Sequence, residues 1–324
     1  MTDVVEGTFS DNIKKINSLR KGGDNKLKKK VKLLGEVRSE QRPVDIEEIR
    51  IKREELNSDV KVPSAPFFGS KHVENVSPKS LMHYLNETML YQFHWGYRKQ
   101  GRSKKEFDEW AVKNLRPILN RISEEALRDE IFSPQAIYGY WEAQAEGNDL
   151  ILFERDSSFE AARFSLPRQG VEGGVCISDF VKDVKSKKRD LVALQLVTIG
   201  QKASDIPRKW FSDNRYEDYL YIHGLGVEIT EALAEYIHAR IRRELGFISE
   251  DASDIKSILR QGYRGSRYSF GYPACPNLRD QEKLLDLLGA HRIGIKLGEE
   301  DQLHPELSTS AIVLHHPQAK YFSV

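Results

Sequence analysis

The stretch "RYSFGYPACPN" (267–277) concentrates residue types that suit the binding of a small ligand. Arg267 offers a planar guanidinium fork that matches a carboxylate. Gly271 has no β-carbon and lets backbone approach a ligand closely. Pro273 and Pro276 fix φ and reduce the entropy lost when the loop is ordered. With its two tyrosines, the pattern predicts either a ligand-binding loop or a structural turn whose tyrosines only pack.

The two cysteines are the only thiols that could act as nucleophiles. Cys275 lies inside the same stretch, between Ala274 and Pro276, and has no base beside it in the sequence. Cys176 lies among apolar residues, as a small core residue does. For both cysteines we expect packing rather than catalysis, and we assign no catalytic residue.

Histidine and glycine patterns give weaker signals. His315 and His316 are adjacent, so on a strand they point to opposite faces and do not easily share a metal. We therefore predict no metal site. Gly224-x-Gly226 precedes a helical pattern, but the dinucleotide fingerprint needs a third glycine where Ile229 stands. Close packing of helices is the favoured interpretation, with a nucleotide-binding turn as the alternative.

The bulk composition narrows the class of protein. The chain has 324 residues with 50 Lys+Arg and 49 Asp+Glu, a net charge of +1. A nucleic-acid-binding protein normally shows a basic excess, so we expect no nucleic-acid partner. The sequence shows no signal peptide and no apolar run near ~20 residues, so we expect no membrane partner and a cytoplasmic location.

The first 61 residues differ from the rest. They contain one aromatic residue, Phe9, and a basic run at 25–36. Such a composition buries too little apolar area to fold alone. We interpret residues 1–61 as a charged, partly helical linker or arm, with helical tendency at 45–56, and we place the start of a packed domain at residue 62.

Residues beyond 62 combine helical and strand periodicities. Apolar spacing predicts three helical stretches and four strand-like stretches. The helical stretches are 77–97, 103–131 with a kink or break at Pro117, and 216–247. The strand-like stretches are 136–155 as a hairpin, 175–181, 190–200 and 310–324. Hairpins with grouped helices indicate an α+β domain rather than repeated βαβ units.

The loop also resembles a known family signature. "RYSFGYPACPN" is similar to the R-x-x-x-G-Y-P-A-C-P motif of the activation domain of cobalamin-dependent methionine synthase. Further segments resemble successive parts of that domain in order: 84–95, 138–153, 176–181, 223–247 and 310–322. The resemblance implies that 62–324 form one C-shaped α+β domain, with a twisted, mainly antiparallel sheet flanked by helices.

The resemblance also implies a binding site for S-adenosylmethionine. At the matching positions, Arg267 pairs with the ligand carboxylate, and Glu231 is a helix carboxylate near the site. The loop and an aromatic pair surround the ligand through Gly271, Tyr272, Pro273, Ala274, Tyr321 and Phe322. This chain departs from the family at Asn86, where many members carry an aspartate for the ligand ammonium. The next residue, Glu87, is a carboxylate that can supply the charge.

The implied chemistry is reductive reactivation. In this family, cobalamin on a partner domain occasionally oxidises to inactive cob(II)alamin, flavodoxin or an equivalent donor supplies one electron, and S-adenosylmethionine supplies the methyl group. The chain lacks the D-x-H-x-x-G cobalamin motif and zinc-binding cysteines. We therefore expect part of a methyltransferase that does not make methionine alone. The alternatives are a sensor or regulatory subunit that binds S-adenosylmethionine, and a free-standing methyltransferase.

Overall fold

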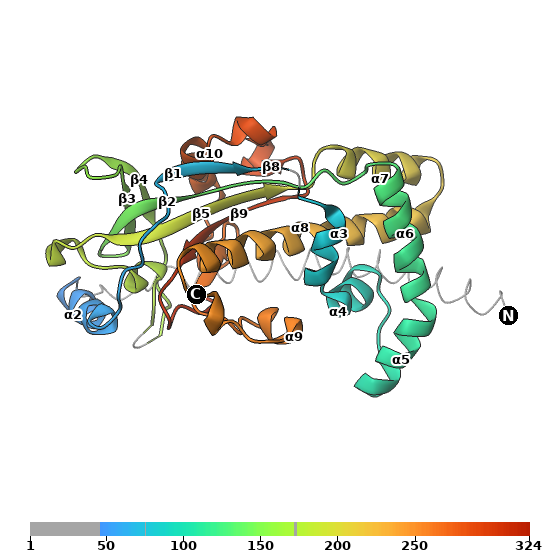
Figure 1. Cartoon of the computed structure of the whole chain (residues 1–324), viewed down its shortest axis with the longest axis horizontal. Helices are drawn as coiled ribbons and strands as arrows, with labels where there is room; N and C mark the ends of the chain where they lie inside the picture. The colour runs from blue at the N-terminus through green and yellow to red at the C-terminus, as the bar shows by residue number, and fades with distance from the viewer. Residues whose placement is uncertain (1–45, 75, 172–173) are drawn as a thin grey trace. The chain divides into compact units, whose positions relative to one another are not determined.

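The computed structural model describes residues 46–74, 76–171 and 174–324 (Figure 1). Its α-helices are α2 (Ile46–Asn57), α3 (Pro78–Leu81), α4 (Glu87–Met89), α5 (Lys104–Asn114), α6 (Arg116–Arg128), α7 (Lys202–Ser212), α8 (Tyr216–Glu244), α9 (Ile255–Ile258) and α10 (Gln281–Leu288). Its strands are β1 (Gly69–Val73), β2 (Gln135–Glu146), β3 (Asp149–Phe153), β4 (Glu160–Ser165), β5 (Asp190–Thr198), β6 (Ser266–Ser269), β7 (Lys296–Leu297), β8 (Leu303–His304) and β9 (Ser308–Leu314).

One antiparallel sheet organises the described part of the chain. Its strand order is β4-β3-β2-β5-β9-β6, and β1 adds a further pairing with β2. The long strand β2 pairs with β5 so that Tyr138 lies opposite Gln195, and β5 pairs with β9 so that Ala193 lies opposite Val313. The expected α+β class with a mainly antiparallel sheet is confirmed.

Both faces of the sheet are covered by helices, which explains why β5 is buried along its whole length. Side chains of a strand alternate between faces. Accordingly Leu191 and Val197 belong to the core cluster that contains residues of α8, whereas Val192 and Leu196 belong to the cluster that contains residues of α10. Figure 1 shows α8 and α10 on opposite sides of the strands.

Helix α8 is the main support of the sheet and contains the Gly224-x-Gly226 pattern in its interior. A β-carbon on Gly224 would lie 2.8 Å from Cβ of His94, and one on Gly226 would lie 2.8 Å from Cδ1 of Leu307. Both distances are too short for real contacts, so a larger residue at either position would require neighbouring side chains to move. This geometry agrees with the packing interpretation rather than with a nucleotide-binding turn.

Several predicted elements are confirmed. The hairpin at 136–155 is β2 and β3, the strand at 190–200 is β5, and the long helix at 216–247 is α8. The pattern at 103–131 is divided into α5 and α6 around Leu115, just before Pro117, which is the break expected from the proline. The strand predicted at 310–324 is confirmed only as far as Leu314, where β9 ends, and residues 315–324 form no strand.

One predicted element is wrong, and another is helical but interrupted. Residues 175–181 form a 3-10 turn, Ile177–Phe180, rather than a strand, because the Asp179 carboxylate accepts a hydrogen bond from the backbone of Cys176 at 2.9 Å and closes the turn. The single helix predicted at 77–97 is interrupted at Asn86, whose side chain accepts the Met89 N–H at 3.2 Å. Such side-chain bonds compete with helical backbone bonds.

Helix α2 belongs to the same compact unit as the rest of the described chain, Ile46–Val324. Arg53 is 1% exposed and its Nη1 lies 2.7 Å from Asp183 Oδ2. Asn57 is also buried and donates to the carbonyl of Asp179 at 2.8 Å. Polar side chains of this charged segment therefore attach α2 to the rest of the unit through an ion pair and hydrogen bonds. The basic run at 25–36 lies outside the described residues.

Helix length and hydropathy bear on membrane insertion. Among the described residues, we find no helix that is both long enough and apolar enough to span a bilayer.

Candidate functional site

The loop residue Arg267 is positioned by strand β6 and faces helix α8. Strand β6 pairs with β9, and Arg267 lies opposite Val313. Its guanidinium reaches two carboxylates that are one turn apart on α8. Nη2 donates to Glu231 Oε2 and Nη1 donates to Glu235 Oε2, both at 3.0 Å. The structure therefore brings together Arg267 and Glu231, which the family resemblance had assigned to one site.

The Arg267 pair continues into the protein as a row of alternating charges. Glu235 accepts a second hydrogen bond from Arg242 Nη2 at 3.1 Å. Arg242 in turn donates to Asp251 through Nε at 2.9 Å and through Nη2 at 2.7 Å. The side chains of Glu235 and Arg242 are 4% and 1% exposed, whereas that of Glu231 is 50% exposed. The row thus runs from the interior to the surface.

The loop after β6 is closed by its own backbone. Gly271 N–H donates to the carbonyl of Cys275, and Cys275 N–H donates to the carbonyl of Tyr272, both at 2.9 Å. Gly271 has φ +88°, a conformation that favours glycine. Tyr272 and Pro273 are exposed at the tip of the loop, while Ala274 is buried at its base. Two backbone hydrogen bonds therefore close the loop between Gly271 and Cys275.

The C-terminal residues lie against this loop. The rings of Tyr272 and Tyr321 are 6.3 Å apart and perpendicular, and both are partly exposed. The rings of Tyr268 and Phe322 are 5.8 Å apart. Partial burial raises the pKa of Tyr272, and the nearby negative charge of Glu231 raises it further. The predicted aromatic pair, Tyr321 and Phe322, therefore lies beside Tyr272 of the loop and Tyr268 of β6.

The remaining predicted residues, Asn86 and Glu87, begin helix α4. Glu87 pairs with Arg116 on α6 at 2.7 Å. Asn86 uses Oδ1 to cap α4. Just before them, the ring of Tyr84 lies 6.1 Å from the ring of Tyr236 on α8. This segment therefore packs against the helix that carries Glu231, but the described polar contacts of Asn86 and Glu87 are directed to α4 and α6 rather than to Arg267.

The two cysteines are buried, and the adjacent histidines His315 and His316 have structural contacts. Cys176 and Cys275 are 0% and 2% exposed, and burial raises the pKa of both thiols. His315 Nε2 lies 2.7 Å from Asp190 Oδ1. His316 Nε2 lies 3.1 Å from the carbonyl of Leu56 in α2. The two adjacent histidines thus have different partners.

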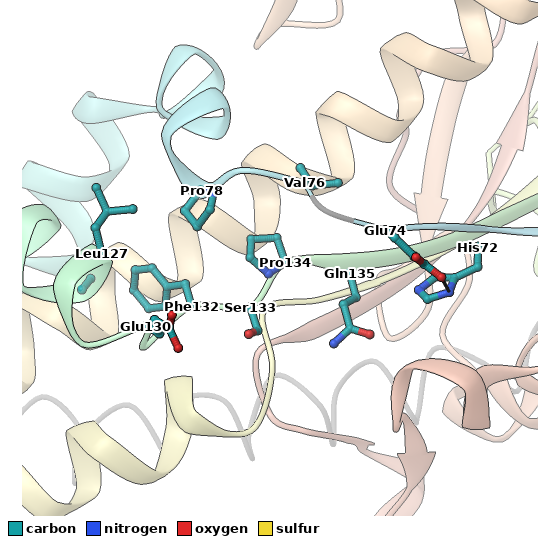
Figure 2. Close-up of a pocket in the computed structure, with 11 residues that line it drawn as sticks. His72, Glu74, Val76, Pro78, Leu127, Glu130, Phe132, Ser133, Pro134 and Gln135 are labelled. Carbon is teal, nitrogen blue, oxygen red and sulfur yellow. Dashed lines mark ion pairs between the residues drawn. The ribbon is translucent and has the colours of Figure 1, made fainter.

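A separate surface pocket lies between the end of α6 and the start of β2 (Figure 2). It has a volume of about 570 Å³, and an ion pair of 3.3 Å joins His72 and Glu74 at one side. Its lining residues are His72, Glu74, Val76, Pro78, Ala126, Leu127, Glu130, Phe132, Ser133, Pro134 and Gln135. The pocket therefore contains none of the residues predicted from the loop signature.

A comparison with models of protein families shows which family the chain belongs to. Residues 79–324 match the family model described as vitamin B12 dependent methionine synthase, activation domain. The chain belongs to this family. Sequence relatives agree: it is 38% identical over 307 residues to methionine synthase of Mycobacterium tuberculosis, and 38% identical over 296 residues to methionine synthase of Mycobacterium leprae. These matches cover 90% and 87% of this chain but only 25% and 24% of the relatives. The chain thus spans about a quarter of their length.

The fold is also found in a solved structure of an activation domain. The crystal structure of the MetH reactivation domain bound to AdoHcy superposes with a TM-score of 0.76. The match covers 87% of this chain and 89% of the other, at 23% sequence identity. At that identity, the comparison establishes that the fold is shared.

The family signature led to Arg267 and Glu231 but not to the carboxylate behind them. Glu235, Arg242 and Asp251 join the activation-domain loop to the interior through ion pairs. A signal for Glu235 was present, because it follows Glu231 by one helical turn and therefore shares its face of the helix. Nothing in the spacing indicated Asp251, which lies beyond the end of α8.

Proposed function

We propose that this chain is the activation module of a cobalamin-dependent methionine synthase. It binds S-adenosylmethionine beside Arg267 and presents the methyl group to cobalamin held by a separate domain. Membership of the activation-domain family supports this proposal, and so does the fold shared with a reactivation domain bound to AdoHcy. Because the chain spans about a quarter of its relatives, methionine synthesis needs parts outside it.

The observation that carries the proposal is the arrangement of Arg267 between two carboxylates, the closed loop and the aromatic pair. A guanidinium fork binds a carboxylate with two parallel hydrogen bonds. The exposed faces of Tyr272 and Tyr321 suit a sulfonium or a heterocycle. The backbone of Gly271, Pro273 and Ala274 would line the ligand.

The other residues predicted for the site complete the proposed contacts. Phe322 packs on Tyr268 and would hold the aromatic wall. Asn86 and Glu87 would face the amino-acid end of the ligand after a change of side-chain rotamer. The Cys275 thiol is buried and its pKa is raised, which suits a site that must not take the methyl group itself.

The proposed partners follow from the chemistry. Cobalamin supplies the metal that accepts the methyl group, and it would come with its own binding domain. Flavodoxin or an equivalent donor would supply one electron in the cytoplasm. In this scheme, residues 1–61 are a charged linker and residues 62–324 are the activation domain, with α2 docked on the latter through Arg53.

Calorimetric titration with S-adenosylmethionine tests the binding step. We expect saturable binding, and we expect Arg267→Lys to weaken it by about tenfold to a hundredfold, because a lost charged hydrogen bond costs about 1.5–3 kcal/mol. Arg208→Lys is the control, since Arg208 also pairs with a carboxylate, Glu306, at 3.2 Å. Absence of saturable binding at millimolar ligand would refute the proposal.

A further inference from the structure

The two carboxylates that hold Arg267 differ in how firmly they are themselves held. Glu235 is 4% exposed and uses both oxygens, one for Arg267 and one for Arg242. Glu231 is 50% exposed and contacts Arg267 through one oxygen. Moving Glu235 would break two ion pairs in the interior, whereas moving Glu231 would break one at the surface. Exposed pairs are worth little.

Further contacts fix the arginine behind Glu235. Arg242 is 1% exposed and donates to both carboxylate oxygens of Asp251 through Nε and Nη2. The guanidinium carbon of Arg242 also lies 4.1 Å from the centre of the Tyr263 ring. Since Arg242 cannot turn without losing these contacts, it holds the Glu235 carboxylate in one orientation.

An amino-acid ligand carries a negative and a positive charge, so it can replace each partner of the Arg267–Glu231 ion pair for the other. Its carboxylate and ammonium are attached to the same carbon, so they lie about as close together as the atoms of an ion pair. Arg267 Nη2 and Glu231 Oε2 are 3.0 Å apart. Glu87 pairs with Arg116 and Asn86 caps α4. Of the predicted site residues, Glu231 is therefore the carboxylate that already contacts Arg267.

We propose that Glu235 is a positioning residue and Glu231 an exchangeable partner. Glu235 keeps the fork of Arg267 in place while Glu231 gives up Nη2 to the ligand carboxylate and takes the ligand ammonium. This inference rests on the proposed function, because it assumes that the ligand of this site carries an amino-acid end. It assigns the selectivity for that end to the ion pairs of α8.

The test compares three ligands by calorimetry on the full chain. S-Adenosylhomocysteine has the complete amino-acid end, 5′-methylthioadenosine has none of it, and the deaminated 2-oxo acid of S-adenosylhomocysteine keeps the carboxylate alone. For Glu235→Gln, we expect the affinity for S-adenosylhomocysteine to fall by about tenfold or more, because Arg267 loses a charged partner. The affinity for 5′-methylthioadenosine should change by less than about twofold.

For Glu231→Gln, we expect changes of opposite sign for two ligands. The variant should bind S-adenosylhomocysteine more weakly, since the ammonium loses its carboxylate. It should bind the 2-oxo acid more tightly than the wild type does, since no carboxylate competes for Arg267 Nη2. Glu228→Gln is the control, because Glu228 is a buried glutamate of the same helix that pairs with His94 at 3.0 Å. It should leave all three affinities unchanged.

The outcomes separate this inference from the proposed function. If the wild type binds none of the ligands, the proposed function fails and the inference fails with it. If the wild type binds S-adenosylhomocysteine but Glu235→Gln weakens all ligands equally, Glu235 is only structural and the inference alone fails. If Glu235→Gln does not fold, Asp251→Asn replaces it, and the same selective loss is expected because Arg242 loses its anchor. An equal effect of Asp251→Asn on all ligands would overturn the inference.

Discussion

Replacing Arg53 by methionine should loosen helix α2 from the rest of the unit. Arg53 is 1% exposed, donates to Asp183 at 2.7 Å and also bonds the carbonyl of Gly147. Methionine fills similar space but leaves the Asp183 carboxylate, itself 5% exposed, without this partner. Removing one partner of a buried ion pair costs about 3–5 kcal/mol.

Urea unfolding of the full chain, followed by circular dichroism, measures this loss. Hydrogen exchange of the α2 amides reports it locally if the helix detaches before the rest unfolds. The matched control is Arg50→Met in the same helix, because Arg50 pairs with Glu47 and with Glu54 at the surface. Arg50→Met should leave the urea midpoint nearly unchanged. If both variants had the same midpoint and the same exchange rates, the buried ion pair would not be what holds α2.

Three further predictions concern Gly271, Cys275 and His238. Gly271→Ala should lower stability by about 1–2 kcal/mol in thermal unfolding, because φ is +88° and the new β-carbon would lie 3.0 Å from Leu278 Cδ2. Cys275, which is 2% exposed with a raised pKa, should react with iodoacetamide in urea but only very slowly in the native chain. His238 is buried and its pKa lies well below 6.5. Since the unfolded state alone takes up the proton, stability should fall by about 2 kcal/mol between pH 7 and pH 5, and His238→Gln should remove that part in urea titrations at both pH values.

Each of these predictions has a result that would contradict it. An alanine at 271 with wild-type stability would show that the loop relaxes, and Gly170→Ala, at a glycine with open space around it, is the reference. Rapid labelling of Cys275 in the native chain would show that the loop opens. An unchanged pH dependence in His238→Gln would mean that titratable groups other than His238 determine the acid sensitivity.

Local periodicity was sufficient to predict the elements whose residues pack in a regular pattern. Strand β5 is mostly apolar because both of its faces are buried, and α8 shows a long helical face. Pro117 marked the break between α5 and α6. The turn at 175–181 was missed because its apolar letters resemble a strand, whereas its conformation is set by the contacts of Asp179 with Arg168 and with the backbone of Cys176.

The site was only partly accessible from the sequence. The loop signature indicated Arg267 and Gly271, whose chemistry and backbone freedom are properties of single residues. The ion pairs of Glu235 with Arg242 and of Arg242 with Asp251 depend on how α8 lies against the chain that follows it. Likewise, the docking of Arg53 on Asp183 joins residues far apart in the sequence. The sequence shows that these residues are charged, but it does not show which residues they pair with.

Formation of methylcobalamin tests the central claim most directly. The assay combines a cobalamin domain in the cob(II)alamin form, reduced flavodoxin, S-adenosylmethionine and this chain, and follows the absorbance of methylcobalamin. We expect methylcobalamin to form only when the chain and S-adenosylmethionine are both present, and to form much more slowly at limiting S-adenosylmethionine with Arg267→Lys. Binding of S-adenosylmethionine without any methylcobalamin formation would contradict the account and indicate a sensor instead.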